Sequence, residues 1–151
     1  MKRIADILTA ECVQDITSTT KDDAISELCG LLKDAPEITD FNKFCSAIKA
    51  RETIMSTGIG AGIAIPHSKT SSISDLVMAV GRTKQGIDFD SLDDLPVYLI
   101  ILVGSSITQG NEFLKILSEI GRFFNEPQHI RMCFEANTSL DLYRLLVEDS
   151  K

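Results

Sequence analysis

Two histidines, His67 and His129, are the side chains of this 151-residue chain that could supply a reactive imidazole. His67 ends the segment GIGAGIAIPH at 58–67, so it follows a glycine-rich stretch and a short apolar run. A neutral imidazole can accept a phosphoryl group through one ring nitrogen, while a hydrogen bond to the other nitrogen fixes the tautomer. His129 lies in a polar helix start, and we interpret it as a solvated side chain.

The glycines before His67 have a possible chemical role of their own. Small residues let backbone N–H groups approach a phosphate, so Thr57, Gly58, Gly60 and Gly62 are candidates for a phosphate environment. The glycine spacing differs from the dinucleotide and P-loop fingerprints, and no nucleotide or other cofactor is predicted. From spacing alone, a solvated turn histidine after a tight glycine turn remains the more economical interpretation.

Composition and charge indicate a globular protein. The chain is 44% hydrophobic and 25% charged, and its length suits a single domain spanning 1–151. The formal charge of −7 argues against nucleic-acid binding, which needs clustered Lys and Arg. We interpret the acidic balance first as a solubility feature and second as a match for a partner with a basic docking face.

The cysteines and apolar stretches exclude further classes of protein. The cysteines are widely spaced, without a zinc or redox spacing, and are expected to be reduced and buried: Cys12, Cys29, Cys45 and Cys133. No metal site is therefore predicted. The N-terminal residues lack the apolar run of a signal peptide, and the longest apolar stretch, 97–103, is too short to span a bilayer. A cytoplasmic protein without membrane insertion is expected.

Periodicity and turn residues predict the elements that position the histidine. Apolar spacings of three and four, with capping residues and prolines, predict helices over 20–32, 41–51, 110–126, 130–136 and 140–147. Continuous apolar runs predict buried strands over 63–65, 76–80 and 97–103, with a short extended piece at 86–90. Segment 55–62 is expected to form neither a helix nor a full strand.

These elements together predict the fold class and the place of His67. Strands in the middle of the sequence with helices before and after them indicate an α/β protein, with a small mixed β-sheet flanked by helices on both sides. Pro66 is expected to end the strand at 63–65. His67 would then lie where a strand leads into a loop, which is a common location for sites in α/β sheets.

The motif around His67 resembles the signature of a known family. Arg51-Glu52 followed by STGIGAGIAIPHSK at 56–69 is similar to the fructose/mannitol/nitrogen-regulatory type of phosphotransferase-system IIA domains. The resemblance extends over the chain in the family's order, through VMAVGR at 77–82, GIDF at 86–89, Pro96-Val97 and the helix opened by 110–112. It implies the mannitol/fructose-type IIA fold.

The resemblance also implies roles for individual residues. His67 would be the phosphorylated residue, and Arg51 would face the phosphohistidine with its permanent charge. The alternative for Arg51 is a helix-end cation near the negative end of the macrodipole. Transport members commonly carry a second histidine where this chain has Phe113, which we interpret as a core aromatic, and Ala61 replaces a frequent Asn or acid. Full phosphotransferase turnover is therefore in question.

The function implied by the resemblance is that of a phosphocarrier with a phosphohistidine intermediate. An HPr/NPr-like protein would donate to His67, and the wording STGIG at 56–60 favours a regulatory, nitrogen-type role in which phosphorylation changes binding to target proteins. One alternative is the IIA component of a fructose/mannitol-class sugar transport system with separate IIB and IIC partners. Another is a binding module that is never phosphorylated.

Overall fold

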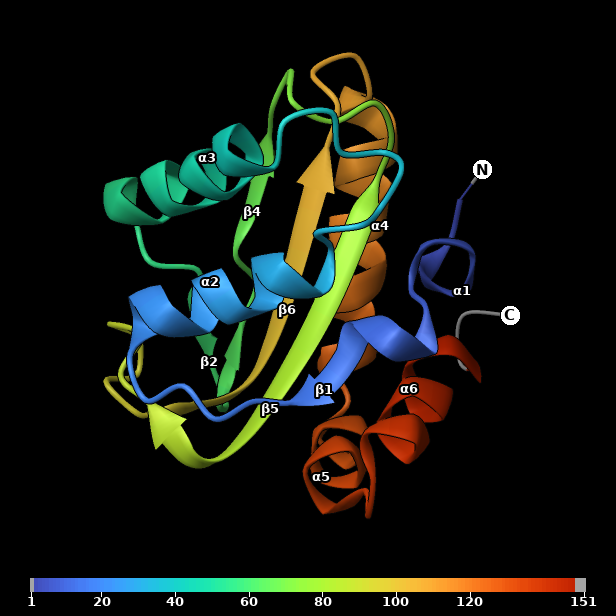
Figure 1. The fold of residues 1–151 in the computed structure, drawn as a ribbon. Coiled ribbons are helices and arrows are strands. Elements are labelled where there is room, and N and C mark those ends of the chain that lie inside the picture. The colour runs from blue at the N-terminus through green and yellow to red at the C-terminus, as the bar shows by residue number, and fades with distance from the viewer. Residues whose placement is uncertain (1, 149–151) are drawn as a thin grey trace.

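A mixed β-sheet forms the centre of the molecule (Figure 1). The computed structural model describes residues 2–148, and both ends of the predicted domain, 1 and 151, lie outside this range. Within it, six strands form one sheet: β1 (Val13–Asp15), β2 (Gly58–Gly60), β3 (Ile63–Ala64), β4 (His67–Lys69), β5 (Val77–Ile87) and β6 (Val97–Ser105).

The strand order is β1-β5-β6-β3-β2, and β4 pairs with β6 beyond the end of β3. The pairs β5–β6 and β2–β3 are antiparallel, whereas β1 is parallel to β5 and both β3 and β4 are parallel to β6. The two long strands, β5 and β6, are buried along most of their length. They carry the continuous apolar runs of the sequence because helices cover both faces of the sheet.

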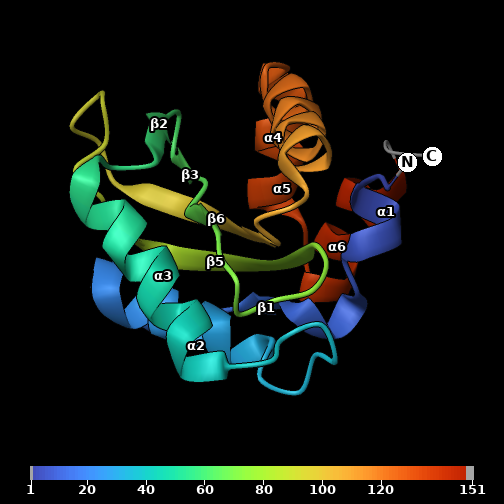
Figure 2. The ribbon, with the colours of Figure 1, turned by 90° about the horizontal axis from the view of Figure 1, so that it is seen from above.

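Figure 2 shows the helices in two layers, one on each face of the sheet. One layer holds α2 (Lys21–Leu31) and α3 (Phe41–Ile54). The opposite layer holds α1 (Ile4–Ile7), α4 (Gly110–Phe124), α5 (Pro127–Glu135) and α6 (Ser139–Glu148), and a 3₁₀ turn, η1 (Ala10–Cys12), leads into β1. Each layer packs its own apolar cluster against the sheet. The predicted fold class, a small mixed sheet flanked by helices on both sides, is confirmed.

Local capping explains where several helices begin. The Thr20 hydroxyl accepts from the Asp23 N–H at the start of α2, and Asp40 accepts from the Lys43 N–H at the start of α3. A cap is also present before α6, because the Thr138 hydroxyl accepts from the Asp141 N–H. Each hydroxyl or carboxylate satisfies an N–H group that has no partner within its helix.

Three expectations about the strands were wrong, and backbone pairing explains each. Gly58–Gly60 forms the short strand β2, because β3 offers an antiparallel partner. The extended piece expected at 86–90 is in part the end of β5, which continues to Ile87 through an irregularity opposite β6. The strand before Pro66 ends as expected, at Ala64, but His67 does not lead into a loop, because the chain pairs with β6 again from His67 onward.

The four cysteines are free, but they differ in burial. Cys29 and Cys133 are fully buried, whereas Cys12 and Cys45 are half-buried, so the expectation of uniformly buried thiols was wrong for the latter pair. No helix between residues 2 and 148 is both long and apolar enough to cross a membrane. In the same range, no three His, Cys, Asp or Glu side chains gather in a way that could hold a metal ion.

Candidate functional site

The candidate site centres on the half-buried ring of His67 at the start of β4. Its Nδ1 lies 2.6 Å from the carbonyl oxygen of Ile65, two residues earlier. A carbonyl oxygen can only accept a hydrogen bond, so Nδ1 carries the proton and donates. Nε2 is then the unprotonated nitrogen of the neutral ring, and its lone pair is available for attack.

Phe113 of α4 packs against this ring. The two ring centroids are 5.7 Å apart, and the planes are inclined by 57°. Phe113 is 6% exposed and belongs to the apolar cluster between α4 and the sheet, which confirms its interpretation as a core aromatic. His67 pairs with Val103, and Val103 belongs to the same cluster, so the imidazole lies on the α4 face of the sheet.

The start of α4 is fixed by polar contacts that sequence reasoning did not identify. Gln109, the residue before the helix, donates to Asp75 at 2.6 Å and to Glu112 at 3.0 Å. Asp75 also accepts from Lys2, and the hydrogen bonds from Lys2 and Gln109, in that order, lower the pKa of the Asp75 carboxyl. The first turn of α4, which carries Phe113, is thus held in place beside His67.

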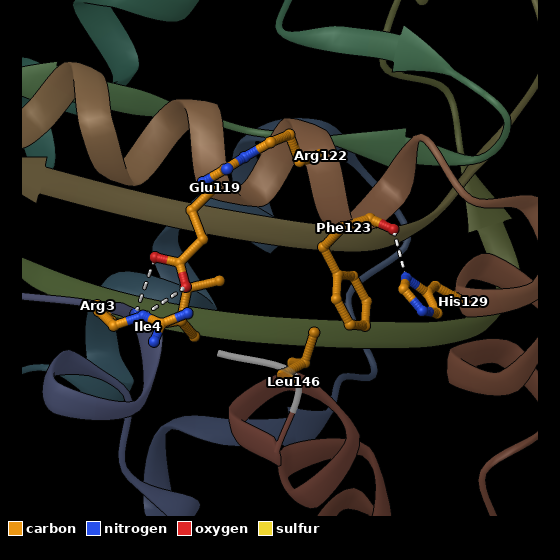
Figure 3. Close-up of a pocket in the computed structure, with 7 residues that line it drawn as sticks. All are labelled: Arg3, Ile4, Glu119, Arg122, Phe123, His129 and Leu146. Atoms are coloured by element: carbon orange, nitrogen blue, oxygen red, sulfur yellow. Dashed lines mark hydrogen bonds and ion pairs between the residues drawn. The ribbon is translucent and has the colours of Figure 1, made fainter. Parts of the chain in front are cut away.

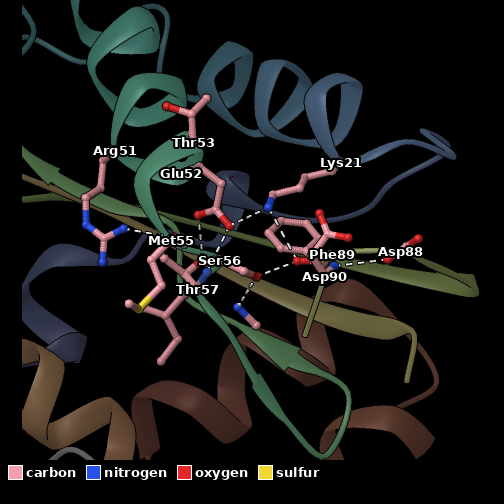
Figure 4. Close-up of polar contacts among 12 residues, drawn as sticks. Lys21, Arg51, Glu52, Thr53, Met55, Ser56, Thr57, Asp88, Phe89 and Asp90 are labelled. Carbon is pink, nitrogen blue, oxygen red and sulfur yellow. Dashed lines mark hydrogen bonds and ion pairs between the residues drawn. The ribbon is translucent and has the colours of Figure 1, made fainter. Parts of the chain in front are cut away.

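Arg51 lies in the last turn of α3, and its guanidinium donates to the carbonyl oxygen of Met55 at 2.9 Å (Figure 4). This contact matches the helix-end role that the sequence left open. Helix α3 packs against β4, the strand that His67 opens. Within residues 2–148, however, no hydrogen bond or ion pair joins Arg51 to His67. The role of Arg51 at a phosphohistidine therefore stays a prediction.

The glycines before His67 form the β2–β3 hairpin and allow close packing around it. Gly62 has a φ of +81°, and a Cβ there would lie 3.0 Å from Phe134 and 3.3 Å from Tyr98. At Gly58 a Cβ would lie 2.2 Å from the hydroxyl of Ser91, so no larger residue fits without moving the backbone. These observations favour the tight-turn role that the sequence analysis left open.

The structure separates most of the predicted phosphate environment from His67. Gly62 accepts from the Leu99 N–H, whereas His67 pairs with Val103, four residues further along β6 and thus ~13 Å away. Gly60 lies at the same level as Gly62, because its partner Ile63 pairs with Leu99. A phosphoryl group on His67 would not reach either glycine.

The other two candidates have N–H groups that are already engaged. The Thr57 N–H donates to Glu52 at 2.9 Å, and the Gly58 N–H donates to the Ser56 hydroxyl at 3.0 Å. Neither N–H is free to bind a phosphate oxygen. The sequence motif indicated that this segment matters, but it could not show that its backbone donors are used within the protein.

His129 belongs to a different part of the molecule. Its ring stacks on Phe123, with centroids 4.3 Å apart, and its Nδ1 lies 2.7 Å from the Phe123 carbonyl oxygen. The ring is half-buried and lines a pocket of about 200 Å³ that also includes Arg3 and Glu119 (Figure 3). The interpretation of His129 as a solvated side chain was therefore wrong, because α4 offers it an aromatic face and a backbone acceptor.

The geometry defines an α/β protein in which a backbone carbonyl oxygen holds Nδ1 of His67. Residues 6–149 match the family described as phosphoenolpyruvate-dependent sugar phosphotransferase system, EIIA 2. The chain therefore belongs to this family of phosphotransferase components, as the resemblance implied.

Relatives of two kinds share the family. The chain is 34% identical to the fructose-specific EIIA component of Haloferax volcanii, over 85% of this chain and 84% of that protein. It is 30% identical to the nitrogen regulatory protein of Pseudomonas aeruginosa, over 98% and 97% of the two chains. The fructose-specific EIIABC component of Bacillus subtilis is 34% identical over 90% of this chain, which spans 22% of that longer protein.

Solved structures have the same fold. The nitrogen regulatory protein IIA-Ntr from Neisseria meningitidis superposes with a TM-score of 0.87 at 26% identity, covering 95% of this chain and 98% of that one. IIA mannitol from Escherichia coli superposes with a TM-score of 0.78 at 19% identity, covering 92% and 98% of the two chains. The latter likeness concerns the fold alone.

Proposed function

We propose that this chain acts in the cytoplasm as a single-domain phosphocarrier that accepts a phosphoryl group on Nε2 of His67. An HPr/NPr-like protein, itself bearing a phosphohistidine, would be the donor. The Nε2 lone pair forms the new N–P bond, and the donor's N–P bond breaks with its electron pair returning to the donor imidazole. Such a transfer requires mainly alignment and charge stabilisation from the protein.

The observation that carries this proposal is the 2.6 Å contact between His67 Nδ1 and the Ile65 carbonyl oxygen. It aims the ring and leaves Nε2 as the nucleophile. When Nε2 becomes bonded to phosphorus, Nδ1 keeps its proton and the ring gains positive charge. The same carbonyl stabilises that N–H, because hydrogen bonds from a charged donor are stronger than neutral ones.

The surroundings of His67 suit a protein donor. Ile107 and Leu114 are both 63% exposed, and they flank the start of α4 on either side of Phe113 in the sequence. Met55, directly after α3, is 67% exposed, and its carbonyl oxygen accepts from the Arg51 guanidinium. Exposed apolar side chains of this kind are typical of protein docking surfaces. In the complex, Arg51 would balance the charge of the transferring group.

We favour a regulatory role over sugar transport. The nitrogen regulatory relative is matched over nearly its whole length, and the nitrogen-type structure superposes better than the mannitol-type structure. Phosphorylation would add about −2 of charge beside an exposed apolar surface and thereby change the binding of target proteins. Sugar transport stays the second candidate, because the fructose-specific relatives are at least as similar in sequence.

The test is labelling by a phosphorylated donor. We expect the wild-type chain to take up ³²P from phosphorylated HPr or NPr, in a form that acid releases and alkali does not. His67→Ala should remain unlabelled, whereas His129→Ala, the matched control, should be labelled as well as wild type. Label retained in His67→Ala would contradict the proposal, and an unlabelled protein that still binds a target would favour the unphosphorylated module.

A second experiment separates regulation from transport. The labelled protein is mixed with purified IIB domains of the fructose and mannitol classes, and the transfer of label is followed over time. A regulatory protein should keep its label over times in which a fructose-specific IIA protein passes it on. Rapid transfer to a IIB domain would favour the transport role instead.

A further inference from the structure

A series of hydrogen bonds connects the buried carboxylate of Glu52 to the ring of His67. Glu52 lies on α3 and is 5% exposed. Its two oxygens accept from Thr57, one from the backbone N–H at 2.9 Å and the other from the side-chain hydroxyl at 2.7 Å (Figure 4). One carboxylate thus fixes both the backbone and the side chain of the residue that precedes β2.

Thr57 passes this constraint to the opposite strand of the hairpin. Its carbonyl oxygen accepts from the Ile65 N–H at 3.1 Å. The carbonyl oxygen of Ile65 in turn accepts from His67 Nδ1 at 2.6 Å. Thr57 and Ile65 are each held through both their N–H and their C=O group, so the acceptor that selects the His67 tautomer depends on where Glu52 places Thr57.

Lys21 of α2 compensates the buried negative charge of Glu52. Its Nζ lies 2.9 Å from the carboxylate, 3.4 Å from the Phe89 carbonyl oxygen and 5.0 Å from the centre of the Phe89 ring. A buried carboxylate is costly unless it is both paired and hydrogen-bonded, and here Lys21 and Thr57 meet both conditions. The cluster is therefore a built feature of the site rather than a surface ion pair.

We propose that Glu52 is a positioning residue for the phosphorylation of His67, acting through Thr57 and Ile65. This inference rests on the function proposed above and adds a residue to it. Glu52 does not act as a base, because its carboxylate faces Thr57 and Lys21 and makes no hydrogen bond to His67. Its effect is to hold the Ile65 carbonyl where Nδ1 donates to it, which keeps the lone pair on Nε2.

The variant that tests this inference is Glu52→Gln, which removes the charge that pairs with Lys21 and whose single amide oxygen cannot replace both carboxylate oxygens as acceptors for Thr57. We expect the kcat of phosphorylation by the donor protein to fall roughly 10- to 100-fold, with little change in the KM for the donor. The spectroscopic expectation is a shift of the ¹⁵N signals of His67 toward a mixture of tautomers. Loss of fold stability alone would not move those two signals in the folded protein.

A matched control uses the other ion pair between the same helices. Lys49 and Asp22 also link α3 to α2, at 3.3 Å, but Asp22 is 73% exposed. Asp22→Asn should therefore leave both the rate and the tautomer of His67 unchanged. Should Glu52→Gln prove unfolded, Thr57→Val serves instead, since it removes only the hydroxyl bond, and Thr57→Ser should restore the wild-type behaviour.

The outcomes separate this inference from the proposed function. Wild-type labelling together with an unchanged rate and tautomer in the folded Glu52→Gln variant would overturn the role of Glu52 and leave the carrier function standing. A wild-type chain that takes no label on His67 would overturn the carrier function. In that case the ¹⁵N signals still decide whether Glu52 sets the tautomer.

Discussion

At the residue scale, a backbone group selects the ring nitrogen of His67 that would react in the proposed transfer. The Ile65 carbonyl oxygen holds Nδ1, and Phe113 covers part of the ring, so Nε2 is left as the nucleophile. Phe113 offers no hydrogen bond to a phosphoryl oxygen. In the proposed transfer the chain therefore has a nucleophile of defined tautomer but no polar neighbour at position 113, where the family resemblance implies a second histidine in transport members.

Phe113→His should supply that neighbour. A hydrogen bond to a charged group contributes about 1.5–3 kcal/mol, so we expect phosphorylation of His67 to accelerate about tenfold or more. Because Phe113 is 6% exposed, the polar ring should also cost about 1–3 kcal/mol of folding stability. Quenched-flow labelling and urea titration measure the two effects, and Phe113→Leu, which adds no donor, is the control. A folded Phe113→His variant with the wild-type rate would contradict this expectation.

The residue types at the site could be predicted from the sequence, but their contacts could not. His67 was identifiable because it ends a distinctive motif, and Phe113 because of its helical spacing. The acceptor for Nδ1 is a main-chain carbonyl, which every residue possesses, so no sequence pattern marks it. Glu52 was visible only as a neighbour of Arg51, since its partners Thr57 and Lys21 come together through folding.

At the element scale, the edge next to β6 is built from two short strands. Pro66 lacks an N–H group, but its carbonyl oxygen still accepts from Val103, so β4 resumes the pairing that β3 began. Periodicity predicted the long helices and the buried strands because their patterns extend over many residues. It could not predict β2 or β4, because a strand of three residues is defined by its partner rather than by its own sequence.

Arg82 of β5 links three elements across the sheet edge. It is 6% exposed and donates to the Asp15 carboxylate of β1 at 2.7 Å, to the Cys133 carbonyl oxygen of α5 at 2.9 Å and to the Ala136 carbonyl oxygen at 2.7 Å. The guanidinium thus compensates two backbone acceptors and one carboxylate. Its removal leaves the buried Cys133 carbonyl oxygen without its donor, whereas the Asp15 carboxylate, which is 49% exposed, can still be hydrated.

We expect Arg82→Met to lower the free energy of unfolding by about 1–3 kcal/mol, the usual cost of leaving a buried hydrogen-bond acceptor without its donor. Arg144→Met is the control, since Arg144 is 66% exposed and its ion pair with Asp141 spans 3.9 Å. Surface pairs of that kind contribute about 0–1 kcal/mol. Urea-induced unfolding followed by circular dichroism compares the two, and equal midpoints would show that the Arg82 network contributes little.

At the scale of the whole molecule, two apolar layers share one sheet. α2 and α3 pack on the face opposite α4, and the candidate site lies on β4, which pairs with β6 and contacts α3, while Phe113 of α4 packs on His67. Strands in the middle of the sequence with helices before and after them predicted these layers, since few arrangements bury all the apolar faces. Which helix covers which face depends on the crossing connections and could not be derived from periodicity.

The two layers also bury thiols, which makes the stability of the molecule sensitive to high pH. Burial raises the pKa of the Cys133 thiol to about 12. The pKa of Cys29 is also raised, first by burial and then by the neighbouring Cys45. In the unfolded chain the pKa of a cysteine thiol is about 8.5, so the native state binds the two thiol protons more tightly than the unfolded state does. This contribution to stability is fully present at pH values below the unfolded-state pKa. It declines as the pH rises toward the pKa values of the thiols in the native state.

Between pH 7.5 and pH 10 we expect each of the two buried thiols to account for a loss of about 1–2 kcal/mol in the free energy of unfolding. Lysine and tyrosine side chains also titrate in this range, so the comparison is between variants at both pH values, with reductant present. The double variant Cys29→Ala/Cys133→Ala should be less stable than wild type at pH 7.5, because it leaves cavities. Its further loss by pH 10 should nevertheless be smaller than that of wild type. A parallel decline in the two proteins would mean that ionisation of these thiols does not control alkaline unfolding.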